Sequence, residues 1–123
     1  MIYTGYFEQL PIYKSKNLFP ISISRTSPDW YEGFSELLAA PTINLSNEFK
    51  VLNNEDYTNK YMVELDKIKD KLGLWIENLT RMVGNKDIIL LCHARSEDFC
   101  YRHILADYLN KTFNMNIKEF INI

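Results

Sequence analysis

The chain has 123 residues, of which 46% are apolar and 24% are charged, and its net charge is −2. This composition is typical of one globular domain and argues against a disordered chain, while the slightly acidic balance argues against extended nucleic acid as a partner. Met1 leads straight into strand-like residues, and the longest apolar run, residues 88–92, is far too short to cross a bilayer. We therefore expect a single cytoplasmic α/β domain over residues 1–123, with reduced cysteines and no membrane contact.

The first third of the chain predicts two strands and a loop rich in aromatic residues. Residues 2–7 (IYTGYF) and 18–24 (LFPISIS) are rich in β-branched and aromatic residues, which favours strands. Gly5 inside the first strand indicates a bulge or a close backbone approach. Residues 25–35 contain Ser, Pro, Asp and Gly together with two large rings, which is typical of a loop.

The middle of the chain has helical periodicity. A short helix is expected over residues 45–52, with Asn44 as its N-cap. Over residues 55–82, apolar side chains recur at steps of three and four, as they do on one face of a helix. We expect Gly73 to separate two helices and Gly84 to end the second.

The last third predicts a buried strand, a helix and a short final strand. Residues 88–92 (IILLC) are continuously apolar, as in a central parallel strand that is covered on both faces. Ser96 is the expected N-cap of a helix that continues over residues 99–113, with two acids in its first turn. Residues 117–121 are the expected last strand.

This order of elements predicts the fold and the place of a site. Strands separated by long helical stretches need crossover connections, so we expect a small Rossmann-like three-layer α/β domain with a mostly parallel sheet of about four strands flanked by helices. Such sheets bind ligands beyond the carboxyl ends of their strands. The segments that begin at Arg25 and at His93 both leave such ends, so a site is predicted where they meet.

The segment from Cys92 to His103 is the densest cluster of reactive side chains, since it holds both cysteines and both histidines. A helix that begins at Ser96 would place Cys100 and Arg102 in its first two turns, where the helix dipole attracts anions and lowers thiol pKa values. An ordinary alternative is that both cysteines are core residues, because a free cysteine packs like a small apolar side chain.

These considerations give a set of candidate residues. Cys100 is predicted as a nucleophile and Asp98 as a catalytic acid. The arginines are expected to hold an anion and the aromatic residues to pack on a planar group, although Trp30 could equally cap the core and Arg95 could be a solvated surface charge. The predicted ligand-binding residues are Tyr6, Arg25, Trp30, Tyr57, His93, Arg95, Arg102 and His103.

Several other classes of site do not fit the sequence. Cys92, His93, Cys100 and His103 reach the number of ligands in a structural zinc site, but two of them are adjacent and the paired C-x2-C spacing is missing, so no metal is predicted. Asp98 stands where a phosphatase loop that begins at Cys92 would need Arg. Gly-rich phosphate-binding motifs are absent, and no cofactor is predicted.

The stretch LLCHARSEDFCYRHILADYL resembles the motif of the domain-of-unknown-function family 488, in which a strand ending in Cys leads, after an acidic loop, to Cys-His-Arg at the start of a helix. Residues 3–7 resemble the first strand of that family. Residues 22–25, with Pro28 and Trp30, resemble its second strand and loop, and Tyr57 with Tyr61 resembles its paired-tyrosine helix.

The resemblance implies a Rossmann-like fold with a nucleotide-sized pocket. It marks six residues, which are Thr4, Gly5, Arg25, Cys92, Cys100 and Arg102. One position departs from the motif, because Tyr101 stands where the family has His, and a His follows at position 103. If the family His is a catalytic acid or base, this departure implies a binding protein that has lost activity.

Three functions follow as hypotheses. The first is a binding protein for a nucleotide or related anionic metabolite, acting as a sensor or a sequestering sponge, for instance in a contest between phage and host. The second is an enzyme of nucleotide or nucleobase metabolism that acts at an N-glycosidic or phosphate-linked centre. The third is a protein–protein interaction module that uses the Trp30 loop. The small size and the many aromatic residues are compatible with a homodimer.

Overall fold

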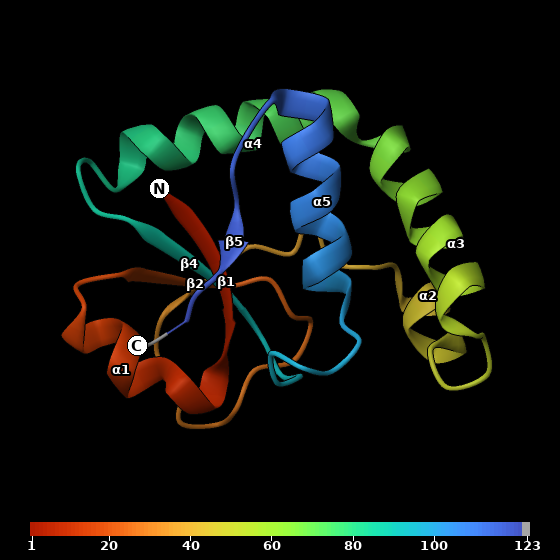
Figure 1. Cartoon of the computed structure of the whole chain (residues 1–123), viewed down its shortest axis with the longest axis horizontal. Coiled ribbons are helices and arrows are strands. Elements are labelled where there is room, and N and C mark those ends of the chain that lie inside the picture. The colour runs from red at the N-terminus through yellow and green to blue at the C-terminus, as the bar shows by residue number, and fades with distance from the viewer. Residues whose placement is uncertain (122–123) are drawn as a thin grey trace.

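In the computed structural model, the described residues 1–121 form a five-stranded sheet in which every pair of neighbours is parallel. The strand order is β3-β2-β4-β1-β5 (Figure 1). The strands are β1 (Ile2–Tyr6), β2 (Phe19–Ser22), β3 (Phe34–Ser35), β4 (Ile88–Cys92) and β5 (Lys118–Glu119). The predicted α/β architecture with a parallel sheet is confirmed, with five strands where about four were expected. The additional strand, β3, has only two residues and lies inside the segment that was expected to be a loop.

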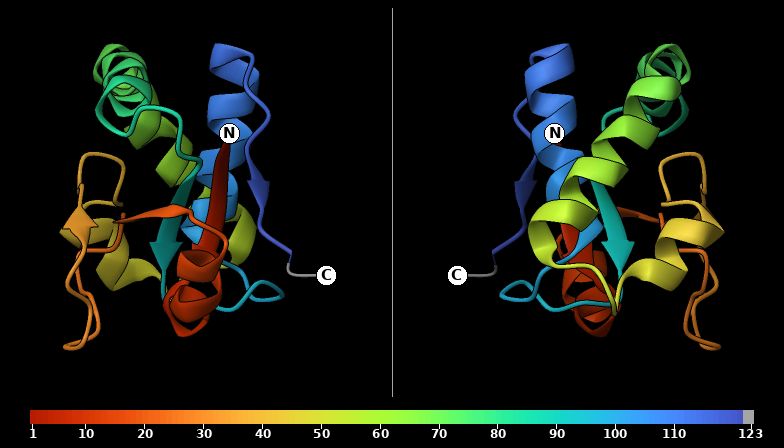
Figure 2. Two further views of the ribbon diagram at one scale, coloured as in Figure 1. Left: turned by 90° about the vertical axis from the view of Figure 1, so that its left-hand side faces the viewer. Right: turned by 90° about the vertical axis from the view of Figure 1, so that its right-hand side faces the viewer.

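Helices cover both faces of the sheet, which makes the domain a three-layer Rossmann-like fold (Figures 1 and 2). A 3-10 turn (Phe7–Gln9) leads into the short helix α1, which packs on one face, while α3, α4 and α5 contribute to the larger core on the other face. The helices are α1 (Leu10–Ser15), α2 (Ile43–Glu48), α3 (Asn54–Lys67), α4 (Lys69–Met82) and α5 (Tyr101–Phe113). Among residues 1–121, no helix has both the length and the apolar character that a membrane span requires.

The central strand β4 is buried along its whole length, as its continuous apolar run predicted. Its side chains alternate between the two cores. Ile88 and Leu90 pack in the core with α3, α4 and α5, whereas Ile89 and Leu91 pack against α1. By the same alternation, Cys92 faces the α5 side of the sheet.

Gly5 lies in β1 at a position where a side chain of α1 packs closely against the strand. The strand pairs continuously with β4, so it has no bulge. A Cβ at Gly5 would collide with the ring of Tyr13 on α1 and approach Ile89 to 2.9 Å. The glycine therefore permits a close approach, and the approaching group is a side chain rather than another backbone.

Two helix boundaries differ from the predictions in the middle of the chain. The break between α3 and α4 falls at Ile68, whose φ of −113° and ψ of 18° leave the helical region, and not at Gly73. Gly73 lies inside α4, where an added Cβ would stand 3.1 Å from the ring of Phe113, so its small size serves packing against α5. Helix α2 begins earlier than expected, because the hydroxyl of Thr42 accepts a hydrogen bond from the Leu45 amide and makes Thr42 the N-cap in place of Asn44.

The start of α5 also differs. The helix begins at Tyr101 with Cys100 as its N-cap residue, so Ser96 does not cap it. The hydroxyl of Ser96 instead donates a 2.6 Å hydrogen bond to Glu119 Oε2 on β5. Residues 93–100 therefore form a non-helical connection between β4 and α5. This connection brings Cys100 back towards the end of β4.

Candidate functional site

The carboxyl ends of β2 and β4 lie side by side, and the segments that follow them touch. His93, directly after β4, forms a 2.8 Å hydrogen bond through Nε2 with the carbonyl oxygen of Thr26, in the loop after β2. Figure 2 shows both segments leaving the same end of the sheet. The segments that follow β4 and β2 therefore lie together at the carboxyl-end edge of the sheet.

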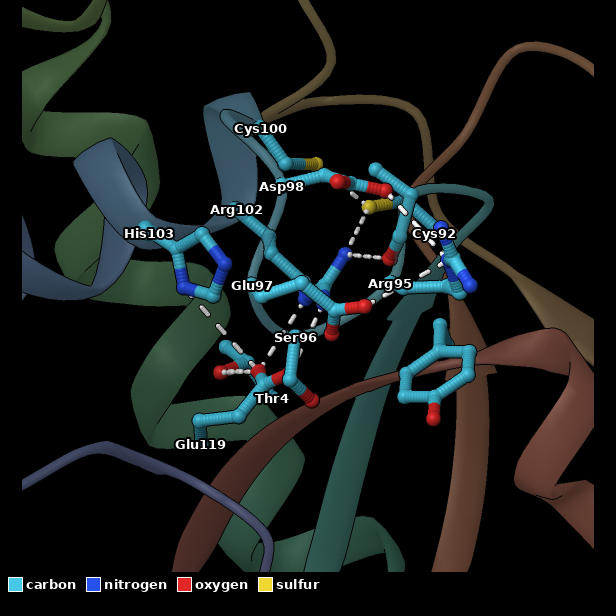
Figure 3. A network of polar contacts seen from close by, with 12 residues as sticks. Thr4, Cys92, Arg95, Ser96, Glu97, Asp98, Cys100, Arg102, His103 and Glu119 are labelled. Atoms are coloured by element: carbon cyan, nitrogen blue, oxygen red, sulfur yellow. Dashed lines mark hydrogen bonds and ion pairs between the residues drawn. The ribbon is translucent and has the colours of Figure 1, made fainter.

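The two cysteines meet at this edge. Cys92 Sγ, at the end of β4, lies 2.7 Å from Cys100 Sγ, at the N-cap of α5 (Figure 3). Both thiols are free and buried, with exposed fractions of 1% and 4%. Two thiols at hydrogen-bonding distance can share one proton, which is the arrangement that stabilises a thiolate.

A buried arginine contacts one of the two thiols. The side chain of Arg102, in the first turn of α5, has no exposed surface. Its Nη1 donates hydrogen bonds to Cys92 Sγ at 2.9 Å and to the carbonyl oxygen of Ala94 at 2.6 Å. The guanidinium therefore places its positive charge against Cys92, and this contact selects Cys92 as the thiolate of the pair.

Glu119 holds the arginine in place. Its carboxylate accepts two hydrogen bonds from Arg102, from Nε at 3.1 Å and from Nη2 at 2.7 Å. It accepts two more from the hydroxyls of Thr4, at 2.7 Å, and Ser96, at 2.6 Å. Thr4 and Glu119 are partners in the β1–β5 register, so the pleat brings them to the same face of the sheet, beneath α5.

The charges of this ion pair follow from their contacts. Burial raises the pKa of Glu119, but the hydrogen bonds from Arg102, Ser96 and Thr4 outweigh it and lower that pKa below its ordinary value of 4.5. Burial lowers the pKa of Arg102, but Glu119 and the two cysteines outweigh it and raise that pKa. The buried pair is therefore ionised, with nearly every polar atom satisfied, as a stable buried ion pair requires.

The pKa values of the two thiols are shifted in opposite directions. The hydrogen bond from Cys100 lowers the pKa of Cys92 to about 7, against the effect of burial and with help from Arg102. The hydrogen bond to Cys92 and burial both raise the pKa of Cys100. Of the two thiols, Cys92 is therefore the one that ionises near neutral pH, and Cys100 is the one that keeps its proton.

Both sulfurs border an apolar pocket of about 240 Å³. Ser24, Ser46, His93 and Ala94 contribute to its walls, and four rings complete them, those of Phe49, Tyr57, Phe99 and Tyr101. Phe49 stacks on Phe99 with centroids 6.0 Å apart, and Tyr57 meets Phe99 edge-on at 5.8 Å. A pocket of this composition accepts a small planar group and presents it to the thiols.

The predicted site residues divide into two groups. Tyr57, His93 and Cys100 line the pocket, and Arg102 lies behind it. Tyr6 lies outside the pocket lining, with its ring centroid 5.9 Å from the guanidinium carbon of Arg102. These five residues therefore belong to one region of the fold.

The remaining predicted residues lie outside the pocket lining. Arg25 donates to the carbonyl oxygen of Pro41, and Trp30 is 56% exposed with its edge against Phe7. Arg95 is exposed and pairs with Glu97 at 3.5 Å and with Asp98 at 3.6 Å. Each of the three arginines that were expected to hold an anion therefore has a partner within the protein.

His103 lies near Glu119 and outside the pocket lining. Its Nδ1 is 4.0 Å from Glu119 Oε1, and its buried Nε2 has no hydrogen-bond partner among the described residues. Burial and Arg102 lower the pKa of His103, although Glu119 and Asp107 raise it. Within residues 1–121, no group of three or more His, Cys, Asp or Glu side chains is arranged to hold a metal ion.

Tyr101 occupies the position where the family motif has His. Its hydroxyl donates a 3.1 Å hydrogen bond to the carbonyl oxygen of Ile23, and its ring packs edge-on against Tyr61. Burial and the nearby Cys92 raise the pKa of Tyr101, so the phenol keeps its proton at neutral pH.

Glu119 is the site residue that the sequence did not indicate. It lies 17 positions after its partner Arg102 and 115 after Thr4, in a strand of two residues, so no local pattern marks it. For Cys92 the sequence left two readings open, a core residue and a residue that the family resemblance marks. The signal for its role was the presence of a second thiol and an arginine within the same short segment.

Comparisons with known proteins identify the family. The model of DUF488-N3a, described as the active DUF488-N3 subclade, matches residues 10–113, which is well over half of the chain. No curated protein and no solved structure matches. The matched residues include the thiol pair and Arg102. The chain therefore belongs to the DUF488 family, within its DUF488-N3 subclade.

Proposed function

We propose that this protein is an enzyme that uses the Cys92 thiolate as a nucleophile on a small molecule whose planar, apolar part occupies the aromatic pocket. The observation that carries the proposal is the environment of Cys92 Sγ, which borders the pocket and is contacted by both the Cys100 thiol and the buried guanidinium of Arg102. A nucleophilic thiol needs an activated sulfur and access to substrate. The two contacts support the first requirement, and the position of Cys92 in the pocket wall supports the second.

Two further observations support this proposal. The subclade that matches the chain is described as active. In addition, Arg102 is fixed by Glu119 before any substrate arrives, so the charge that stabilises the thiolate is already in position. The proposal moves the nucleophile from Cys100, the sequence-based candidate, to Cys92. Cys100 then serves as the hydrogen-bond donor to the thiolate.

The substrate class follows from the pocket. Four aromatic rings and a volume of about 240 Å³ suit a single planar ring system, and a nucleobase is one such group. Arg95 and Arg102 are already paired with acids, so the pocket supplies recognition through ring packing more than through anion binding.

The first test is the pH dependence of alkylation by iodoacetamide. We expect Cys92 to react with a midpoint near its pKa of about 7, and Cys100→Ala to shift that midpoint upward because the main cause of the lowered pKa is lost. Peptide mapping by mass spectrometry assigns the alkylated residue. A midpoint like that of an ordinary exposed thiol, near pH 8.5, would remove the basis of the proposal.

Turnover is tested separately with nucleosides, nucleotides and other small aromatic compounds. We expect the wild-type protein to convert one of these compounds over time. We expect the Cys92→Ser variant to show no such conversion. The exposed residue Met82, at the end of α4, supplies the matched control, since Met82→Ala leaves the rate unchanged.

A second candidate is stoichiometric binding of a nucleotide or related anionic metabolite, as a sensor or sponge. The observation that favours it is Tyr101, a neutral phenol that holds the backbone of Ile23 where the family motif has His. Native mass spectrometry of the protein with each compound separates the two candidates. A retained, unchanged ligand supports binding, and a converted ligand supports the enzyme.

A further inference from the structure

We propose that the reacting atom of the substrate is a sulfur in a sulfur–sulfur bond, and that Cys92 and Cys100 reduce this bond together as a catalytic dithiol. This inference rests on the proposed function, because it keeps Cys92 as the nucleophile and the aromatic pocket as the substrate site. It adds the class of substrate and a chemical role for Cys100.

The placement of the second thiol leads to this inference. A nucleophilic thiolate needs only a proton donor beside it, and a hydroxyl or an amide would serve. Here the neighbour is itself a thiol, 2.7 Å away, and it borders the same pocket. A disulfide bond is about 2.05 Å long, so the two sulfurs are within an ångström of bonding distance. Cys100 can therefore attack any sulfur adduct that forms on Cys92.

The first step is thiol–disulfide exchange at Cys92. The thiolate attacks one sulfur of the substrate R–S–S–R′, so that a Cys92–S–S–R bond forms and the substrate bond breaks. The sulfur of R′ leaves with the electron pair and takes the proton of Cys100, which lies beside the reacting sulfur. Arg102 contacts Cys92 Sγ and so steers the attack to Cys92.

The second step resolves the adduct. The Cys100 thiolate attacks Cys92 Sγ, the Cys92–Cys100 disulfide forms, and R–S⁻ leaves and takes a proton from water. The substrate has then gained two electrons and two protons. The protein has supplied both electrons and the proton of Cys100, and water has supplied the other proton. Two molecules of a low-molecular-weight thiol such as glutathione reduce the Cys92–Cys100 disulfide and are joined in a disulfide of their own. They supply the two electrons that restore the dithiol, so the reaction balances with this thiol as co-reactant.

The surroundings of the pair favour the reduced form. Arg102 is fully buried and is held in place by Glu119. Its positive charge stabilises the Cys92 thiolate in the reduced protein. In the disulfide the Cys92 sulfur carries no negative charge, so this stabilisation is lost. A dithiol that is stabilised in this way forms a disulfide that is readily reduced again. That property suits a catalyst that must be regenerated and does not suit a structural crosslink.

The size of the pocket limits the substrate. A volume of about 240 Å³ walled by aromatic rings accommodates one aromatic half of a small disulfide. The thiols themselves are almost fully buried, so a disulfide within a folded protein cannot reach them without opening the site. The substrate is therefore a small aromatic disulfide or a mixed disulfide that carries one planar group.

The test uses 4,4′-dithiodipyridine, an aromatic disulfide that releases coloured thiopyridone. With an excess of the probe and no other thiol, the full chain is expected to release two thiopyridones per protein and to lose the mass of two hydrogen atoms. Cys100→Ser is expected to release one and to keep one thiopyridyl group on Cys92. Cys92→Ser is expected to lose at least ten-fold in the rate of the first release, and Met82→Ala is the matched control.

Turnover is then measured with limiting protein, excess probe and glutathione. We expect a rate above that of glutathione alone, and a loss of that excess in Cys92→Ser. Circular dichroism of each variant checks folding, and Cys100→Ala serves as a second variant if Cys100→Ser does not fold.

The outcomes separate the two proposals. If wild-type protein stops at a stable thiopyridyl adduct, or forms the disulfide without turnover above the glutathione rate, the dithiol mechanism is overturned while Cys92 remains the nucleophile. If Cys92 reacts with neither iodoacetamide nor the probe faster than an ordinary thiol, both proposals fail together.

Discussion

At the scale of single residues, the proposed chemistry depends on how the buried positive charge of Arg102 is shared between Cys92 and Glu119. Arg102 donates to Cys92 on one side and to Glu119 on the other, and Glu119 in turn accepts hydroxyl hydrogen bonds from Thr4 and Ser96. The carboxylate keeps the buried guanidinium charged and in place, so that Nη1 of Arg102 can donate to Cys92. Positioning of Arg102 is therefore the role that we assign to Glu119.

This assignment predicts a large difference between two Glu→Gln substitutions. Glu119→Gln leaves the buried guanidinium of Arg102 without its carboxylate, and we expect it to lower the free energy of unfolding by about 3–5 kcal/mol. Glu97→Gln removes the acid from an exposed pair with Arg95, and we expect a change within about 0.5 kcal/mol. Urea denaturation of both variants measures the difference. Equal effects would mean that the buried pair has no special importance for stability.

At the scale of elements, the absence of a side chain at Gly5 allows β1 and α1 to pack closely. The backbone amide of Tyr6 also donates a 3.2 Å hydrogen bond to the Tyr13 hydroxyl, so the tyrosine is held directly over the glycine. An added Cβ at Gly5 would collide with this ring. The first helix thus depends on a glycine in the first strand.

We expect Gly5→Ala to destabilise the fold by about 1–3 kcal/mol, because a methyl group is forced into a packed contact. A double variant with Tyr13→Leu should recover part of this loss, since the smaller side chain makes room. Chemical denaturation of the two single variants and the double variant gives the coupling between the positions. Strictly additive losses would contradict the contact.

Element boundaries also show the limit of local patterns. Ser96 followed by two acids is a good N-cap signal, yet its hydroxyl donates to Glu119, and α5 begins five positions later. Gly73 is a good helix breaker, yet the helix continues through it because Phe113 packs closely against that position. In both cases a contact with a distant segment is stronger than the local preference.

At the scale of the whole molecule, acid sensitivity follows from groups whose pKa is lowered on folding. Contacts lower the pKa of Glu119 below its ordinary 4.5, and burial lowers that of His103 below its ordinary 6.5. For each group the unfolded chain binds a proton at a higher pH than the folded chain does. The stability that each contributes is therefore present above its ordinary pKa and is lost as the pH falls through the folded pKa.

Between pH 7 and pH 4 we accordingly expect the free energy of unfolding to fall on acidification, first below about pH 6.5 and more steeply below about pH 4.5. His103→Gln should remove the first part and Glu119→Gln the second. Urea denaturation at a series of pH values measures this profile. A wild-type profile that is flat from pH 7 to pH 4 would show that these groups are not perturbed as the structure indicates.

The sequence alone was sufficient for the architecture. The continuous apolar run of residues 88–92, the β-branched segments before it and the helical periodicity of residues 55–82 are local patterns, and they predicted a parallel α/β sheet with a site where the segments after β2 and β4 meet. It also singled out the cysteines and Arg102 as candidates, because they are close in sequence. Local patterns suffice here because burial and periodicity act between near neighbours along the chain.

Only the tertiary structure decided which of these residues act together. It turned Arg102 inward to Glu119, 17 positions away, and left Arg25 and Arg95 outside the pocket lining. It also brought Cys100 against Cys92 and placed the guanidinium of Arg102 against the Cys92 sulfur. The physical reason is that charge and proton sharing depend on distances of about 3 Å across strands and helices. Such distances are determined by the packing of elements far apart in the chain, and no local pattern records them.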